Sequence, residues 1–221
     1  MTTKQLLIVE DNVAEAIWAQ YYAIKAGIKD LVVATNLEDA QRYLPQVKKV
    51  ATDLFFTSGN MCAHPHIQRF LPLYEKYRTE NFPKIKEPNV VLESVKKCAE
   101  VFNVTPSEYV ENFMAKMNTA SITLSAAREA VAGIKDYENY QKFLKIEEEI
   151  RTGKSLPLGI IVCEQARERG LASAIVTSTD HHDLAFRPIQ GLIRATYFDT
   201  LLEESKNWKA AIDYLLGEGS N

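Results

Sequence analysis

The sequence predicts an α/β protein with a doubly wound, parallel sheet of five strands, interrupted after the third strand by a helical subdomain. Two observations lead to this prediction. Short apolar runs alternate with amphipathic helical patterns, and the first run, Leu6–Val9, is wholly apolar, as is typical of a strand buried on both faces. Residues 62–155, in contrast, carry mainly helical patterns. We therefore expect a discontinuous α/β domain, residues 1–61 and 156–221, and an inserted helical subdomain, residues 62–155.

Five segments have the length and composition of buried strands. They are Leu6–Val9, Leu31–Ala34, Asp53–Thr57, Ser173–Thr177 and Thr196–Asp199. Amphipathic helices are expected after the first, second and fourth strands, and a helix over Leu158–Gly170 is expected before the fourth. A last helix is predicted over Ser205–Leu216, with Ser205 as its N-cap.

The inserted subdomain is expected to be a helical bundle. Its predicted helices are Arg69–Glu80, Val90–Phe102, Pro106–Ala132 and Tyr137–Arg151. Thr105 and Glu108 form the pattern of a capping box around Pro106, and Gly133 is interpreted as the break before the last of these helices. Aromatic residues recur on the apolar faces, which favours a bundle with its own hydrophobic core.

Two adjacent acids, Glu10 and Asp11, directly follow the first predicted strand. In an open α/β sheet the binding crevice lies at the carboxyl ends of the strands, so these carboxylates are expected at that crevice. Neighbouring carboxylates repel each other, and a hard cation such as Mg²⁺ relieves the repulsion. A metal site is one interpretation. The other is an acidic loop whose charge interacts favourably with the amino terminus of the next helix.

The composition excludes several classes of function. The chain has 221 residues, of which 46% are hydrophobic, so a packed core is expected. A formal net charge of −3 argues against a general nucleic-acid or membrane-surface binder. Neither a signal-peptide pattern nor an apolar run of membrane-spanning length is present. Cys62, Cys98 and Cys163 are widely spaced and odd in number, as is typical of reduced thiols in a cytoplasmic protein.

The order of these elements resembles the receiver domain of response regulators in two-component signalling. The resemblance covers residues 1–61 and 156–221. Residues 6–12, LLIVEDN, are similar to the family's first strand and acidic pair, and residues 52–61 resemble its third strand and the following loop. Ala174–Ser178 resembles the fourth strand, with Ser178 at the hydroxyl position. The resemblance implies a flavodoxin-like fold, a Mg²⁺ site at Glu10 and Asp11, and a role in signalling.

The chain departs from the receiver pattern at the phosphoacceptor. Receivers accept a phosphoryl group on an aspartate at the end of the third strand, and with Asp53–Thr57 as that strand, Ser58 occupies this position. A serine hydroxyl neither attacks phosphorus without a base nor ligates the metal as a carboxylate does. Asp53 is the alternative acceptor, but it requires Lys48–Thr52 as the strand, which is short and far less apolar.

A second departure concerns the lysine that receivers place at the end of the fifth strand. The predicted strand Thr196–Asp199 offers none, and the next lysine, Lys206, falls inside the predicted last helix. Without that cation a phosphoryl group lacks its usual charge partner. We therefore expect a pseudo-receiver, a signalling or protein-interaction module that is not phosphorylated on an aspartate. Its partner is expected to be a protein that binds the helical insertion, and the resemblance suggests a homodimer.

An enzyme is the alternative function. Two pairs of histidines are predicted to emerge on the same edge of the sheet as the acids: His64, His66, His181 and His182. If they converge, they form a Zn²⁺ site for a metal-dependent hydrolase, whereas unrelated loop and cap histidines are the simpler interpretation. Residues 166–178 also resemble the second motif of haloacid-dehalogenase-like phosphohydrolases, which carry helical caps. That motif set needs a second acid two residues after the nucleophile, and Asp53 is followed there by Phe55.

Overall fold

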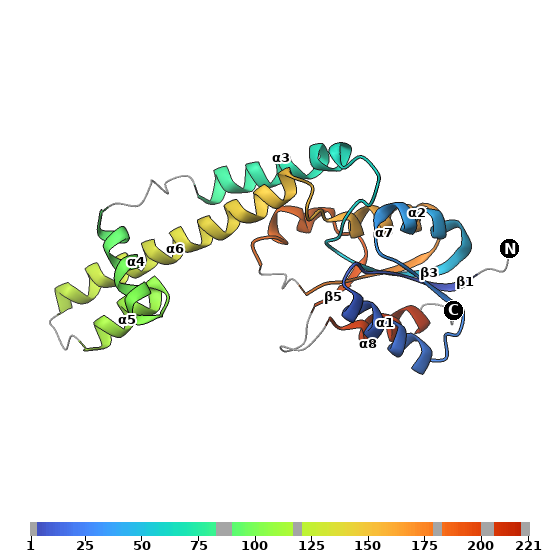
Figure 1. Ribbon diagram of the computed structural model, residues 1–221, viewed down its shortest axis with the longest axis horizontal. Helices are drawn as coiled ribbons and strands as arrows, with labels where there is room; N and C mark the ends of the chain where they lie inside the picture. The colour runs from blue at the N-terminus through green and yellow to red at the C-terminus, as the bar shows by residue number, and fades with distance from the viewer. Residues whose placement is uncertain (1–3, 83–89, 117–120, 179–182, 200–205, 218–221) are drawn as a thin grey trace. The chain divides into compact units, whose positions relative to one another are not determined.

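The computed structural model describes residues 4–82, 90–116, 121–178, 183–199 and 206–217. Five parallel strands form one sheet in the order β2-β1-β3-β4-β5 (Figure 1). The strands are β1 Lys4–Val9, β2 Leu31–Ala34, β3 Val47–Asp53, β4 Ala172–Val176 and β5 Thr196–Phe198. This is the strand order of the flavodoxin-like, doubly wound fold, and it confirms the predicted fold class.

The chain divides into two compact units, which are described separately. The first, Met1–Glu75 with Ile146–Asn221, contains the whole sheet, and the second is Lys76–Lys145. The predicted insertion, residues 62–155, therefore includes the second unit together with flanking segments that belong to the first.

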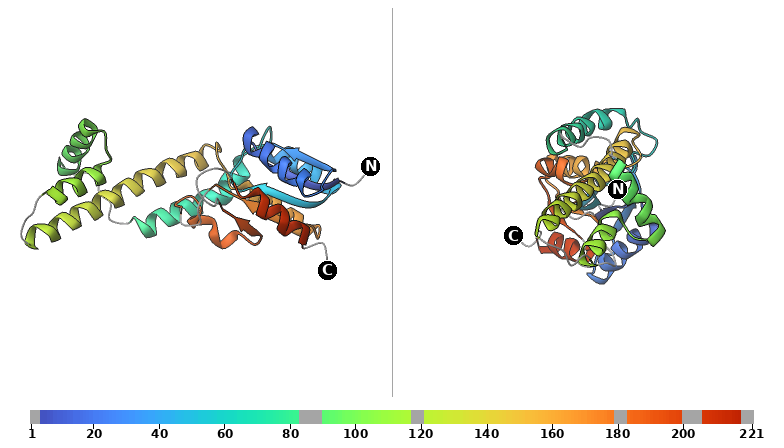
Figure 2. Two further views of the ribbon diagram at one scale, coloured as in Figure 1. Left: turned by 90° about the horizontal axis from the view of Figure 1, so that it is seen from below. Right: turned by 90° about the vertical axis from the view of Figure 1, so that its left-hand side faces the viewer.

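Helices cover both faces of the sheet in the first unit. Helices α1 (Val13–Lys25) and α8 (Trp208–Gly217) lie side by side on one face (Figures 1 and 2), where they pack on Leu6 and Ile8 of β1. Helices α2 (Leu37–Tyr43) and α7 (Leu158–Glu168) cover the other face. All four apolar residues of the Leu6–Val9 run are fully buried, as a strand covered on both faces requires.

The prediction for the third strand was wrong. The strand is β3, Val47–Asp53, and the apolar run that follows Asp53 lies beyond its end. Lys48 and Lys49 made this segment too polar to be predicted as a buried strand. Both stand near its amino-terminal end, where a long lysine side chain can reach solvent or a carbonyl group while its backbone stays in the strand. Lys48 is exposed, and the ammonium of Lys49 donates to the backbone carbonyl of Leu215 in α8.

The last helix begins later than predicted. Helix α8 starts at Trp208, because the side chain of Asn207 accepts a hydrogen bond from the backbone N–H of Ala210 (3.2 Å) and so acts as the N-cap. Lys206 therefore precedes the helix instead of lying within it. The predicted N-cap, Ser205, lies outside the described residues.

The helix predicted after the fourth strand is also absent from the part of that connection which the structure describes. Residues 183–199 contain one helical element, the 3₁₀ helix η2 (Arg187–Leu192). Gly191 favours a short element, because glycine weakens a helix interior, whereas Pro188 stands in the first turn of η2, where proline is tolerated. A second 3₁₀ helix, η1 (Leu44–Gln46), joins α2 to β3.

The second unit is helical. Helix α3 (His64–Asn81) enters it, α4 (Val90–Phe102) and α5 (Pro106–Lys116) lie within it, and α6 (Ser121–Arg151) leaves it. Phe143 is fully buried against Tyr77 and Phe82, with ring centroids 5.3 and 5.6 Å away. These aromatic contacts agree with the expected bundle core.

The helix predicted over Val90–Phe102 is confirmed, but the helix predicted over Pro106–Ala132 was wrong, because α5 ends at Lys116 and α6 already begins at Ser121. Thr105 and Glu108 exchange the two hydrogen bonds of a capping box, which confirms the predicted cap. The predicted break at Gly133 was wrong, since α6 continues through it, and a single glycine costs a helix only about 1 kcal/mol. No helix among the described residues is long and apolar enough to cross a membrane.

Candidate functional site

Three carboxylates converge where β1 and β3 end. Glu10 and Asp11 follow β1, and Asp53 is the last residue of β3, which pairs with β1 so that Val9 lies beside Thr52. One oxygen of each carboxylate lies within 4.8 Å of the others. The crossovers from these two strands leave on opposite faces of the sheet, so this is the switch point at which doubly wound folds bind ligands.

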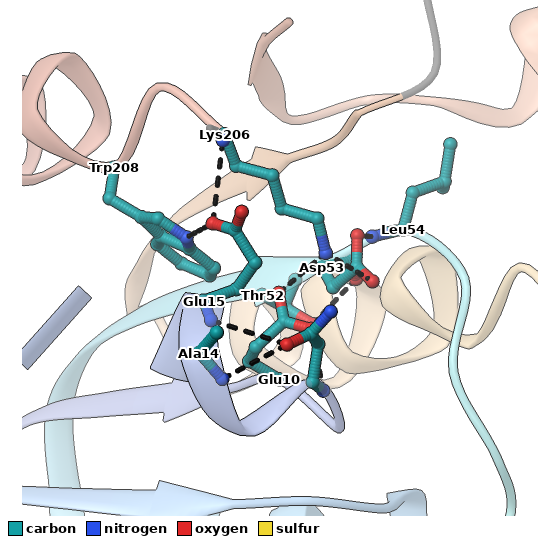
Figure 3. A network of polar contacts seen from close by, with 9 residues as sticks. Glu10, Ala14, Glu15, Thr52, Asp53, Leu54, Lys206 and Trp208 are labelled. Atoms are coloured by element: carbon teal, nitrogen blue, oxygen red, sulfur yellow. Dashed lines mark hydrogen bonds and ion pairs between the residues drawn. The ribbon is translucent and has the colours of Figure 1, made fainter. Parts of the chain in front are cut away.

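Lys206 completes the cluster from the other end of the chain (Figure 3). Its ammonium lies 2.5 Å from Oε2 of Glu10 and 2.7 Å from Oδ2 of Asp53. Glu10 is fully buried, and Asp53 and Lys206 are 5% and 7% exposed. The described site therefore contains one buried cation between two buried acids, with the exposed residue Asp11 at its rim.

Local hydrogen bonds fix the acids in place. The backbone N–H of Asn12 donates to Oε1 of Glu10 (2.9 Å), and the side chain of Asn12 caps α1 by accepting from Ala14 N (3.0 Å). The backbone N–H of Leu54 donates to Oδ1 of Asp53 (2.7 Å). The second oxygen of each buried carboxylate thus remains directed at Lys206.

A second contact holds the segment that carries Lys206. The indole Nε1 of Trp208 donates to Oε2 of Glu15 in the first turn of α1 (3.0 Å), and the backbone N–H of Lys206 lies 3.4 Å from the same oxygen. Trp208 is fully buried. The start of α8 is thereby attached to the start of α1, directly beside the acidic cluster.

Burial and mutual repulsion disfavour the ionised acids. Desolvation is the largest cause for Asp53 and, with the nearby charge of Glu10, raises its pKa to about 7, although Lys206 opposes the shift. Desolvation likewise raises the pKa of Glu10 and that of Asp11. Burial opposes the charge of Lys206, but Asp53 and Glu10 outweigh it and raise the lysine pKa, so the ammonium stays charged.

This arrangement fits a cation. Three carboxylates against one ammonium leave a net charge of 2− when all are ionised, and their oxygens are the ligand type that hard divalent cations bind. Glu10, Asp11 and Asp53 form the only group of three or more potential metal ligands in the described part of the chain. The cluster could therefore bind a metal ion.

Of the three predicted site residues other than Glu10 and Asp11, Asp53 belongs to the acidic cluster, and Ser58 and Ser178 do not. Asp53, the alternative acceptor, stands at the end of β3 within the cluster. Ser58, the favoured acceptor position, lies five residues further on, and its hydroxyl donates to the carbonyl of Met61 (3.2 Å). Ser178 is exposed, whereas Thr177, which the sequence reasoning did not select, is the buried hydroxyl residue directly after β4.

Two of the four histidines of the predicted zinc site lie within the described residues. His64 and His66 belong to the first turn of α3, and neither is part of the acidic cluster. His64 bonds to Gln68 (2.9 Å), and burial, assisted by Arg69, lowers the pKa of His66. His181 and His182 lie outside the described residues.

The fold and the site together define a flavodoxin-like α/β protein with an acidic cluster and a buried lysine at the switch point of its sheet. Comparisons of this chain with protein-family models, curated proteins and solved structures found no match. Its assignment to a functional class therefore depends on strand order and site geometry.

Proposed function

We propose that this chain is a receiver-like signalling module in which Asp53 accepts a phosphoryl group. The observation that carries the proposal is the position of the Asp53 carboxylate at the end of β3, with Lys206 2.7 Å from its Oδ2. The expectation of an inactive site depended on a serine at the end of the third strand and on a missing lysine. Neither premise holds once β3 ends at Asp53 and Lys206 lies against it.

The chemistry that these residues support is nucleophilic attack by a carboxylate. Oδ2 of Asp53 would form a bond to the phosphorus of a small donor such as acetyl phosphate, while the bond from phosphorus to the acetate oxygen breaks. The products are an aspartyl phosphate and acetate, and no proton is gained or lost. Lys206 stands where its ammonium would pair with the phosphoryl oxygens.

Glu10, Asp11 and Asp53 would hold Mg²⁺ in this proposal. When bound, the cation would neutralise charge on the phosphoryl oxygens and on the acids. The acids themselves support the assignment, because burial, the largest cause, raises the pKa of all three and so disfavours their ionised forms. A divalent cation favours the ionised form of Asp53, which is the nucleophile.

Intact-mass spectrometry after incubation with acetyl phosphate and Mg²⁺ tests the proposal. We expect a mass increase of one phosphoryl group that hydroxylamine removes, as it does from acyl phosphates, and that EDTA prevents. Asp53→Asn should abolish the adduct, whereas Ser58→Ala should leave it unchanged. An adduct that survives Asp53→Asn, or no adduct on the wild-type protein, would overturn the assignment of Asp53.

The second candidate is a pseudo-receiver that acts only by binding a protein partner through its helical insertion. It is favoured by two adjacent, exposed apolar side chains in the second unit, Val101 (80% exposed) and Phe102 (65% exposed). The same experiment separates the candidates, because a binding-only module takes up no phosphoryl group from acetyl phosphate under any of these conditions.

A further inference from the structure

A cavity of about 200 Å³ lies beside the sheet, on the face that α7 covers. Its walls come from α7, from β4 and the first residue of β5, from the segment that joins η2 to β5, and from Tyr214 of α8. Ile160, Ile175 and Leu192 supply apolar surface, and Ser173 of β4 supplies a polar group. The residues that line it are different from those of the acidic cluster, so it is a separate site.

The described part of the connection between β4 and β5 contains no α-helix, and this explains why the cavity exists. A parallel crossover usually places a helix against the sheet and covers both of its strands. Within residues 183–199 the helical structure is limited to the six-residue η2, and residues 193–195 join it to β5 without regular structure. Side chains of α7 and of that segment therefore surround a space that a longer helix would fill.

Two guanidinium groups line the cavity without a partner. Within the residues that the structure describes, the side chains of Arg167 and Arg194 make no hydrogen bond or ion pair. The acid that lines the same cavity, Glu164, is already paired with Arg69 through two bonds of 2.6 and 2.8 Å. The cavity thus offers two unmatched positive charges beside an apolar surface, in a chain whose net charge is −3.

The cavity is suited to binding and not to covalent chemistry. Its one thiol, Cys163, is buried, and this burial raises the thiol pKa to about 12, so it stays neutral and unreactive. Ser173 is hydrogen-bonded to that thiol, and none of the described residues that line the cavity is a histidine that could activate the hydroxyl.

We propose that this cavity binds a small organic carboxylate with a compact apolar body, whose anionic group pairs with Arg167 and Arg194. The size fits such a ligand, since an apolar cavity of roughly 150 Å³ holds benzene in another protein. A volume of about 200 Å³ leaves room for a ring of that size with one carboxylate group. Guanidinium groups match the planar geometry of a carboxylate, and the apolar wall favours an organic ion over inorganic phosphate. The inference does not depend on phosphorylation of Asp53.

Titration of the ¹⁵N-labelled protein with benzoate, followed by amide chemical shifts, tests this inference. We expect saturable shifts at Ser173 and at residues 192–196, with a dissociation constant on the order of 1 mM, as befits a ligand of this size. Benzylammonium, which has the same ring and the opposite charge, should give no saturable shifts there. Inorganic phosphate should bind far more weakly than benzoate.

Substitutions distinguish binding of benzoate in the cavity from a non-specific attraction of the anion to any arginine. Arg167→Gln and Arg194→Gln should each weaken benzoate about tenfold, the effect of one charge-assisted hydrogen bond. Arg169→Gln is the matched control, because Arg169 is an exposed arginine at the end of the same helix that does not line the cavity. Ala195→Leu should weaken benzoate by filling the space without a change in charge.

Three outcomes would overturn the proposal. They are the absence of saturable benzoate shifts in the wild-type protein, equal affinity for benzylammonium, and equal losses for Arg169→Gln and Arg167→Gln. The amide spectrum of each variant shows at the same time whether it is folded. All four substitutions replace partly or fully exposed side chains, so the fold should persist.

Discussion

Replacement of Asp53 by asparagine should stabilise the protein at neutral and higher pH, although it removes one partner of a buried ion pair. The asparagine side chain cannot ionise, but its oxygen can still accept the hydrogen bond that Leu54 N–H donates to Asp53 Oδ1 (2.7 Å). The buried site would then hold Glu10 against Lys206, one acid for one cation. The substitution thus relieves the charge excess and keeps the local backbone contact.

The raised pKa of Asp53 sets the sign and the size of this effect. The folded protein binds the Asp53 proton more tightly than the unfolded chain does, so the stability that the group contributes is complete below about pH 4 and is lost as pH rises to about 7. The difference between about 7 and the ordinary 3.8, at 1.36 kcal/mol per pKa unit, is about 4 kcal/mol. Asp53→Asn should therefore gain roughly 2–4 kcal/mol near pH 8 and much less near pH 4.

Urea denaturation followed by tryptophan fluorescence, with EDTA present, measures these free energies of unfolding. Trp208 is fully buried beside the site, which makes it a sensitive probe. Asp213→Asn is the matched control, because Asp213 forms an exposed pair with Lys209 on α8, and it should leave the free energy of unfolding nearly unchanged at either pH.

Lys206→Met provides the opposite perturbation. It leaves the two buried acids without their cation, so it should destabilise the protein by about 3–5 kcal/mol near pH 8 and by less at low pH, where the acids are protonated. If Asp53→Asn instead destabilised the protein near pH 8 as strongly as Lys206→Met does, attraction to Lys206 would outweigh burial and repulsion. That result would refute the reasoning from charge excess.

Two further predictions concern the backbone and the anchor of the site. A Cβ on Gly159 would lie 2.1 Å from the carbonyl oxygen of the last residue of β3. In the same urea experiment, Gly159→Ala should therefore lower the free energy of unfolding by about 2 kcal/mol or more. Gly191→Ala is the control, because a Cβ there meets open space, and it should change the free energy of unfolding by less than about 0.5 kcal/mol. Trp208→Phe removes the indole hydrogen bond to Glu15 (3.0 Å) and should cost about 2 kcal/mol, while Trp18→Phe, at an exposed position, should have little effect. Because Trp208→Phe lacks the fluorescent probe, urea denaturation of both variants is followed by far-UV circular dichroism. Equal losses for the two tryptophans would contradict the role assigned to that bond.

The sequence predicted the sheet and the acidic pair because both have strong local signals. The apolar run Leu6–Val9 can hardly be anything but a buried strand, and Glu10 and Asp11 follow it directly. The third strand was misplaced because its amino-terminal half contains Lys48 and Lys49, while the segment after Asp53 is more apolar. Local hydrophobicity could not show that Lys49 reaches a carbonyl of α8, which is a long-range contact.

The partnership of Lys206 with Asp53 had no comparable signal. The two residues are far apart in the sequence, and the helical pattern around Lys206 continues without interruption into α8. One local cue was present, since Asn207 is a favoured N-cap residue and would have placed Lys206 before the helix. The direction of the Lys206 side chain follows from tertiary contacts, in particular from the bond between Trp208 and Glu15.

At the acidic site the fold buries more carboxylates than cations, which stability alone would not favour. Elsewhere, the described strands bury mainly apolar side chains against helices, as Val50 and Ala51 of β3 do. At the switch point the fold brings three carboxylates within 4.8 Å of one another and supplies one ammonium. An apolar replacement of similar volume would commonly be as stable or more stable. Because the fold holds these charges in a buried place, a bound cation together with an ionised Asp53 would relieve the excess of negative charge directly.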